Sequence, residues 1–211
     1  MRKYKIKELF YTLQGEGAQT GRPAIFCRFT GCNLWSGREE DRSTAICQFC
    51  DTEFRGTDGQ NGGRYTAVEL AQKARSLWPE NTKQKPYIVC TGGEPLLQLD
   101  EPLVDAFHQE NFEVAIETNG TIAAPKNIDW ICMSPKAGTE IVLTTGNELK
   151  LVYPQVALPP SLFEAYHFDY FYLQAMDGDQ QKENIDASLD YCLAHPQWRL
   201  SLQTHKILGI E

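Results

Sequence analysis

The stretch YIVCTGGEP, residues 87–95, shows the pattern on which the fold of this chain depends. Its first four residues are apolar and mostly β-branched or aromatic, which is typical of a buried strand, and a turn with two glycines follows directly. The same order recurs along the chain, where short apolar runs are followed by polar, glycine-containing or ligand-capable residues. The other runs are 24–29, 113–117, 129–133, 149–153, 169–174 and 198–203.

Helical patterns separate several of these runs. Residues 66–78 begin with Thr66 and Glu69, which form the signature of a capping box. Further helices are expected at 100–111, with Asp100 or Glu101 at the N-cap, and at 183–195. The apolar face expected for the last helix consists of Ile185, Leu189, Cys192 and Leu193. Alternating strands and helices favour a mostly parallel α/β sheet, in which functional sites form at the carboxyl ends of the strands.

Length and composition narrow the class of protein. The chain has 211 residues, which suits one domain spanning 1–211, and its apolar content of 42% is that of a globular protein. A net charge of −8 argues against broad binding of nucleic acid. The segment MRKYKIKELF at the start lacks the apolar core of a signal peptide, and no apolar run reaches membrane-spanning length. We therefore expect a cytoplasmic protein.

Three of the seven cysteines are clustered in the sequence. Cys47 and Cys50 form a C-x-x-C pair, and fourteen residues separate Cys32 from Cys47. A disulfide framework is not expected in the cytosol, so metal binding is the better interpretation. One alternative is zinc, with a remote His205 or His167 as the fourth ligand. The other is a 4Fe–4S cluster that leaves one iron without a protein ligand. Cys27, Cys90, Cys132 and Cys192 are interpreted as buried apolar residues.

Seven motifs together resemble one family. They are FYTLQGEG (10–17), FCRFTGCN (26–33), CDT (50–52), CTGGEP (90–95), IETNG (116–120), SPK (134–136) and QTHK (203–206). Over nearly the whole chain they are similar to the 7-carboxy-7-deazaguanine synthase family of the radical S-adenosylmethionine superfamily. That superfamily usually has C-x3-C-x2-C, whereas this chain has C-x14-C-x2-C, a variant that occurs in this family.

The resemblance implies a fold and an activity. The fold would be a partial β/α barrel, a shortened radical S-adenosylmethionine core with a mostly parallel sheet. The reaction would convert 6-carboxy-5,6,7,8-tetrahydropterin to 7-carboxy-7-deazaguanine by hydrogen abstraction at C6, ring contraction and loss of ammonia. The product of such a lyase is used to make queuosine, a modified nucleoside of tRNA, and other 7-deazapurines. The resemblance also implies that the protein is a homodimer and that an electron donor such as flavodoxin reduces it.

The resemblance also implies roles for particular residues. Cys32, Cys47 and Cys50 would hold the 4Fe–4S cluster, and Thr52 would bind Mg²⁺. The contacts implied for S-adenosylmethionine are Phe49, Cys50, Asp51, Gly93, Glu94, Ser134, Pro135, Lys136, Gln174, Ala175, Met176 and Asp177. At Ala175 the family pattern has proline. Gly93 and Glu94 would supply acceptors for the amino group of the cofactor, and Glu117 and Asn119 are candidates for its ribose.

The contacts implied for the pterin substrate are Leu13, Gln14, Gly15, Glu16, Arg28, Thr91, His205 and Glu211. Glu16 would pair with the aminopyrimidine nitrogens. Arg28 lies inside an expected strand, where a grip on the substrate carboxylate or a salt bridge to a neighbouring acid would explain its charge. Relatives often end on a proline whose carboxylate reaches the substrate, whereas this chain ends on Glu211. His108, His167 and His195 are interpreted as surface or packing residues.

Two other functions are compatible with parts of this pattern. A different radical enzyme, such as an activase with a peptide partner, would need the same cluster. A zinc-binding module without catalytic activity would use the thiols alone. For the charged segment REEDR inside the insertion 33–46, a solvated surface is the expected explanation.

Overall fold

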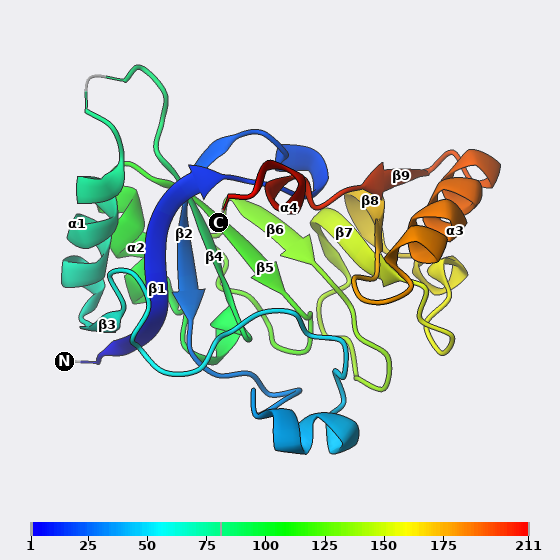
Figure 1. The fold of residues 1–211 in the computed structure, drawn as a ribbon. Coiled ribbons are helices and arrows are strands. Elements are labelled where there is room, and N and C mark those ends of the chain that lie inside the picture. Colours follow the sequence, from blue (N-terminus) through cyan, green and yellow to red (C-terminus); the bar gives the residue numbers. More distant parts are fainter. Residues whose placement is uncertain (1, 81, 211) are drawn as a thin grey trace.

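The computed structural model describes residues 2–80 and 82–210, which form a mixed α/β fold around one sheet (Figure 1). Within the described residues the sheet has nine strands in the order β3-β1-β2-β4-β5-β6-β7-β8-β9. Their bounds are β1 Tyr4–Leu13, β2 Pro23–Phe29, β3 Gly63–Tyr65, β4 Tyr87–Gly92, β5 Glu113–Thr118, β6 Trp130–Met133, β7 Thr145–Tyr153, β8 His167–Ala175 and β9 Trp198–Ser201. Since β3 and β9 do not pair, the barrel is incomplete, as expected.

From β2 to β9 the strands of the sheet are parallel, whereas β1 pairs antiparallel with both β2 and β3. The parallel strands match the apolar runs of the sequence. The sequence patterns did not identify β1 and β3. In β1, Tyr4 and Ile6 are buried and alternate with lysines, because only one side of this antiparallel strand faces the core.

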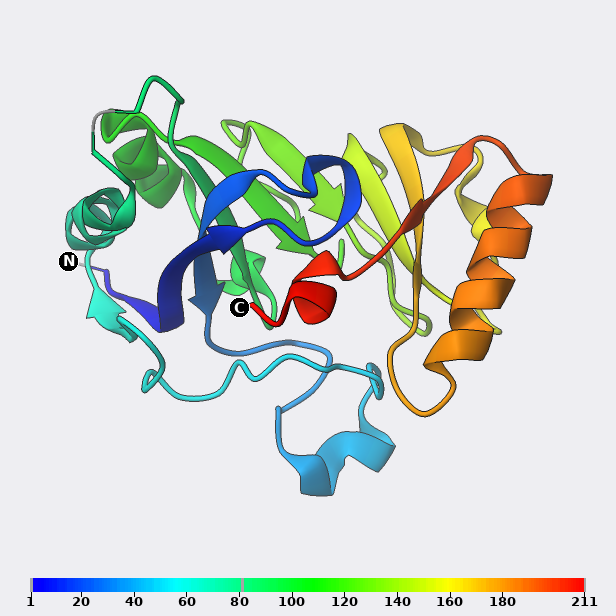
Figure 2. The ribbon, with the colours of Figure 1, turned by 45° about the horizontal axis from the view of Figure 1, so that its top comes forward.

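The helices cover the sheet at two places (Figures 1 and 2). The α-helices are α1 Ala67–Leu77, α2 Glu101–Gln109, α3 Gln181–Ala194 and α4 Thr204–Leu208, and the short 3-10 helices are η1 Gly17–Gln19, η2 Glu39–Thr44, η3 Pro95–Leu97 and η4 Pro160–Phe163. Helices α1 and α2 pack on each other, α1 also packs on β1, β2 and β3, α2 packs on β5, and α3 packs on β8 and β9. Within the described residues no helix has both the length and the apolar character needed to cross a membrane.

The caps of α1 and α2 confirm the sequence pattern. Thr66 accepts a hydrogen bond from the backbone N–H of Glu69 at 3.3 Å, and the Glu69 carboxylate accepts one from the backbone N–H of Thr66 at 2.8 Å. Asp100 caps α2 by accepting from the N–H of Leu103 at 3.2 Å. Both helices therefore begin where the capping residues place them.

The apolar face expected for α3 is partly wrong. Leu189 and Leu193 are 42% and 73% exposed, whereas Ser188 is fully buried. The helix contacts the sheet through a stripe that runs through Asn184, Ser188 and Tyr191, and Asn184 donates a hydrogen bond to the carbonyl of Met176. A polar contact and a small side chain thus fix the rotation of α3, and the leucines face outward.

The core has two parts. The larger part joins α1 and α2 to β1, β2, β4 and β5, with Leu70, Leu103 and Phe107 fully buried. The smaller part lies under β7, β8 and β9 around Leu151 and Trp198. Both parts hold the parallel strands rigidly in register, so that their carboxyl ends meet at a common site.

Candidate functional site

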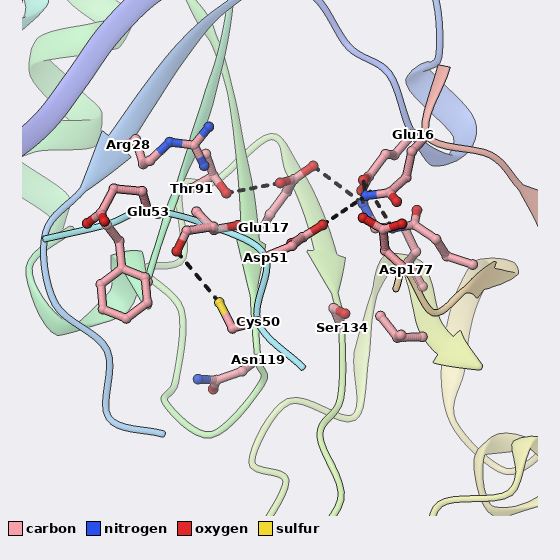
Figure 3. Close-up of a pocket in the computed structure, with 18 of the residues that line it drawn as sticks. Glu16, Arg28, Cys50, Asp51, Glu53, Thr91, Glu117, Asn119, Ser134 and Asp177 are labelled. Carbon is pink, nitrogen blue, oxygen red and sulfur yellow. Dashed lines mark hydrogen bonds and ion pairs between the residues drawn. The ribbon is translucent and has the colours of Figure 1, made fainter. Parts of the chain in front are cut away.

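A cavity of about 520 Å³ opens at the carboxyl ends of the parallel strands (Figure 3). Most residues selected from the sequence line it: Leu13, Gln14, Gly15, Glu16, Arg28, Cys32, Cys47, Phe49, Cys50, Asp51, Thr52, Thr91, Gly93, Ser134, Lys136, Gln174, Ala175, Asp177 and His205. Glu94, Pro135 and Met176 do not line it, and Glu211 lies outside the described residues. Separate motifs of the sequence therefore meet at one cavity.

The three clustered cysteines reach the cavity from two segments. Cys32 follows β2, while Cys47 and Cys50 lie where the insertion 33–46 returns to the sheet. All three thiols are free, and burial raises the pKa of each. A cation beside them favours the thiolate form: Lys136 lowers the pKa of Cys47, although burial has the larger effect.

The donor set of three cysteines at one cavity fits an iron–sulfur cluster. Within the described residues no three His, Cys, Asp or Glu side chains converge on one ion position. Of the two histidines considered as a fourth zinc ligand, His167 begins β8 at the end away from the cavity, whereas His205 lines the cavity with the three cysteines. In a 4Fe–4S cluster each cysteine binds a different iron, so the three sulfurs surround the cluster without meeting at a point.

The remaining cysteines lie in the packed interior or on α3. Cys27 and Cys90 are fully buried and face each other across the β2–β4 pair. Cys132 is buried in β6, and Cys192 packs partly buried on α3. Their interpretation as packing residues agrees with these positions.

The glycine pair at the end of β4, Gly92 and Gly93, lies against the chain that leads to Cys32. A Cβ atom at Gly93 would come within 2.1 Å of the carbonyl oxygen of Gly31 and 2.8 Å of the Cβ of Cys32. Only glycine permits this approach. The glycine turn thus fixes the first cysteine next to the end of β4.

The side chain of Glu94 forms its hydrogen bonds within the protein and does not line the cavity. It is fully buried, and its carboxylate accepts hydrogen bonds from Thr118 Oγ1 at 2.8 Å and from the backbone N–H of Asn119 at 2.8 Å and Leu96 at 3.0 Å. Burial raises the pKa of this carboxyl group. Glu94 therefore ties the ends of β4 and β5 together behind the cavity.

Glu117 and Asn119, at and just after the end of β5, both line the cavity. Glu117 accepts hydrogen bonds from Gln14 Nε2 and from Thr91 Oγ1, each at 3.0 Å (Figure 3). The amide of Asn119 donates to the side chain of Asn33 at 2.9 Å, next to the first cysteine. Glu117 thus joins the substrate-side motifs, while Asn119 joins β5 to the cysteine segment.

A buried lysine was missed by the sequence patterns. Lys150 of β7 is 5% exposed, and its ammonium group lies 2.5 Å from Glu16 and 3.5 Å from Glu117. Burial alone would lower its pKa, but these two carboxylates raise it well above the usual value. The sequence carried a signal, since a lysine inside the apolar run LKLVY needs buried partners.

Glu16 lies at the centre of this polar network. Besides Lys150, its carboxylate accepts hydrogen bonds from Gln174 Nε2 and Gln203 Nε2, each at 3.0 Å. Burial opposes ionisation of Glu16, but Lys150 and Gln203 hold its pKa below the usual value. An ionised, fixed carboxylate at this place is a good acceptor for N–H donors of a planar ligand.

Arg28 has the salt bridge that the sequence offered as one alternative. Its Nε lies 2.7 Å from Glu8 Oε1 on β1, and both side chains line the cavity. Figure 3 shows the guanidinium group next to Thr91, facing the open space. The Nε side of the guanidinium group is therefore paired with Glu8. The group still lines the cavity, where it could bind an anionic ligand.

The C-terminal helix α4 closes one side of the cavity. The backbone N–H of Thr204 donates to the carbonyl of Gly15 at 2.9 Å, and the ring of His205 occupies the space where a Cβ at Gly15 would lie. Lys206 bridges Asp51, at 2.7 Å, and Asp177, at 2.5 Å. The sequence patterns selected His205 but not Gln203 or Lys206.

Three free thiols, a glycine turn and a polar network of carboxylates and a lysine meet at the carboxyl ends of the strands, as the resemblance to the radical S-adenosylmethionine class of enzymes implies. Relatives and a solved structure agree with this class. The chain is 60% identical over 209 residues to 7-carboxy-7-deazaguanine synthase of Bradyrhizobium diazoefficiens, covering 99% of both chains. It is 56% identical over 208 residues to the enzyme of the same name from Burkholderia multivorans, covering 98% of this chain and 99% of that one.

The crystal structure of QueE from Escherichia coli superposes with a TM-score of 0.72 at 28% identity, covering 95% of this chain and 94% of that one. No model of a protein family matches the chain. The chain belongs to the 7-carboxy-7-deazaguanine synthase family. The resemblance seen in its motifs is thereby confirmed.

Proposed function

We propose that this protein converts 6-carboxy-5,6,7,8-tetrahydropterin to 7-carboxy-7-deazaguanine, with a 4Fe–4S cluster, S-adenosylmethionine and Mg²⁺. The observation that carries the proposal is that the three free thiols and the Glu16–Glu117–Lys150 network line the same cavity. A radical formed at the thiol side would therefore arise next to a substrate held at the network side.

Cys32, Cys47 and Cys50 would bind three irons of the cluster and leave the fourth for the amino and carboxylate groups of S-adenosylmethionine. When bound, the cluster and this cofactor supply a 5′-deoxyadenosyl radical. The residues proposed to contact the cofactor by side chain or backbone are Phe49, Cys50, Asp51, Gly93, Glu94, Ser134, Pro135, Lys136, Gln174, Ala175, Met176 and Asp177. For Glu94, Pro135 and Met176, which do not line the cavity, support comes only from the motif.

The substrate would lie between the network and the first strands. Glu16 and Glu117 are fixed acceptors, and they suit the N–H donors of an aminopyrimidine ring. Arg28 would attract the substrate carboxylate, with Leu13, Gln14, Gly15, Thr91 and His205 around the ring. Thr52 lines the cavity next to Cys50 and would bind Mg²⁺, which takes few protein ligands. We also propose that Glu211 contacts the substrate.

The wider context follows from the family. We propose that residues 1–211 act as one domain in a cytoplasmic homodimer, that a reductant of the flavodoxin type supplies the electron, and that the product enters queuosine or other 7-deazapurine pathways. The open edge strands and the exposed leucines of α3 leave apolar surface for a second copy.

Anaerobic reconstitution with iron and sulfide tests the proposal. The expected result is about four irons and four sulfides per chain and turnover of the carboxy-tetrahydropterin to the deazaguanine without net consumption of S-adenosylmethionine. A loaded cluster without deazaguanine product would indicate another radical reaction, such as activation of a peptide partner. Zinc without sulfide would exclude radical chemistry.

A further inference from the structure

The insertion between Cys32 and Cys47 has one side chain that turns back to the cysteine turn. The insertion carries η2, which stands away from the sheet (Figures 1 and 2). Arg38 and Arg42 flank or lie within this helix. The side chain of Arg38 is 58% exposed and pairs with Glu40, whereas that of Arg42 is 28% exposed. The charged segment is therefore not uniformly a solvated surface.

The side chain of Arg42 is hydrogen-bonded to the backbone of the turn between Cys47 and Cys50. Its Nη1 donates hydrogen bonds to the carbonyl of Gln48 at 2.9 Å and to the carbonyl of Cys50 at 3.0 Å. Its Nε donates to the Glu39 carboxylate at 2.8 Å, which orients the guanidinium group. In the described structure, residues 47–55 belong to neither helix nor strand. The turn therefore depends on contacts of this kind for a fixed shape.

Trp35 supports the guanidinium group from the other side. The centre of the Arg42 guanidinium lies 4.1 Å from the centroid of the Trp35 ring. Trp35 is 8% exposed, lines the cavity and packs edge-on against Phe54 at 5.6 Å between centroids. Trp35 and Arg42 both belong to the insertion, so this stack connects the insertion to Phe54, which follows the C-x-x-C pair. A planar guanidinium can stack and donate in two directions at once, which an ammonium group cannot do.

We propose that Arg42 is a positioning residue for the iron–sulfur cluster: it holds Cys47 and Cys50 in the geometry that binds the cluster, and its charge stabilises the reduced form. The proposal rests on the proposed function for the presence of the cluster. A cluster with three thiolate ligands is anionic, so a nearby fixed cation makes addition of an electron easier. The proposal also gives the long C-x14-C-x2-C spacing a role, because the insertion 33–46 carries Arg42, which holds the turn of Cys47 and Cys50.

The test compares Arg42→Gln with Arg38→Gln, a control that removes a positive charge from the same insertion without touching the cysteine turn. Arg42→Lys is a third variant that keeps the charge. Three measurements are made: amide hydrogen exchange of residues 47–52 in the metal-free protein, the rate at which a chelator removes iron from the anaerobically reconstituted protein, and the reduction potential of the reconstituted cluster.

For Arg42→Gln we expect exchange of residues 47–52 and release of iron to be about tenfold faster than in the wild type, as loss of charge-assisted hydrogen bonds predicts. Arg42→Lys should release iron faster than the wild type but retain a higher cluster reduction potential than Arg42→Gln. Arg38→Gln should match the wild type. The proposal is overturned if Arg42→Gln matches Arg38→Gln in any of the three measurements.

Failure of the proposed function gives a different result. If the wild type holds a cluster but forms no deazaguanine, the substrate is wrong, and the three measurements still decide the role of Arg42. If it binds zinc without sulfide, the cluster is wrong, and with it the proposed role of Arg42.

Discussion

The two walls of the cavity are built in opposite ways. The wall on the sheet carries Glu117 of β5 and Lys150 of β7, together with Glu16 in the turn after β1, and their charges are paired and mostly shielded from solvent. The wall formed by the cysteine loop has no regular structure at residues 47–55 and is held by Arg42, by Trp35 and at its mouth by Lys206. The sheet wall is shaped before any ligand binds, whereas the loop wall depends on exposed contacts and on the group it holds. Substitutions in the two walls should therefore differ in kind.

Replacing a cysteine in the loop wall should cost all activity and little stability. In Cys32→Ala one of the three proposed cluster ligands is missing, so iron and sulfide should fall to background and turnover by more than about a thousandfold. The free energy of unfolding of the metal-free protein should change by less than about 1 kcal/mol, because Cys32 is only partly buried. Iron analysis and denaturant unfolding measure the two effects. A variant that still loads a full cluster would remove Cys32 from the ligand set.

Replacing the lysine of the sheet wall should cost stability as well as activity. Lys150→Met leaves two partly buried carboxylates, 16% and 22% exposed, without their cation, and loss of one partner of a buried pair costs up to about 3–5 kcal/mol. Denaturant unfolding of the metal-free protein measures the loss. The double variant Glu16→Gln with Lys150→Met should be less destabilised than the sum of the single variants. If the free energy of unfolding falls by no more than an exposed salt bridge contributes, the network does not stabilise this wall.

The same variant predicts a pH dependence. Burial would raise the pKa of Glu16, but Lys150 holds it below the usual value. The wild type therefore has this stabilisation above about pH 4.3, the value for an unfolded glutamate, and loses it as pH falls through the lower pKa of the folded state. In Lys150→Met burial acts without the lysine and raises that pKa, so protonation restores stability as pH falls. The difference in unfolding free energy between the two proteins should shrink from about pH 7 to about pH 4. A constant difference would contradict this account.

The contrast between the walls also explains what the sequence predicted. Parallel strands such as β4 and β5 are buried on both sides, so their apolar runs were visible, and the residues after them marked the cavity. The strand β1 was missed because its lysines alternate with buried residues such as Ile6. Lys150 was missed because its partners, Glu16 and Glu117, are distant in the sequence and meet only in the folded sheet. The inward turn of Arg42 likewise depends on how the insertion folds back, which a run of charges does not encode.

The smallest effect is expected where the two walls meet at the mouth. Lys206 links Asp51 of the cysteine loop to Asp177 after β8, but its side chain is 36% exposed, and solvent screens such pairs. Lys206→Gln should therefore lower stability by at most about 1 kcal/mol. Because Asp51 and Asp177 belong to the segments proposed to bind S-adenosylmethionine, the KM for this cofactor should rise about two- to fivefold with kcat little changed. The wild-type KM should rise with salt towards that of the variant, since salt weakens an exposed ion pair. Steady-state kinetics at low and high salt, with Arg38→Gln as the control, measure both effects. A large fall in kcat with unchanged KM would instead place Lys206 in the chemical step, and the mouth would then belong to the rigid wall.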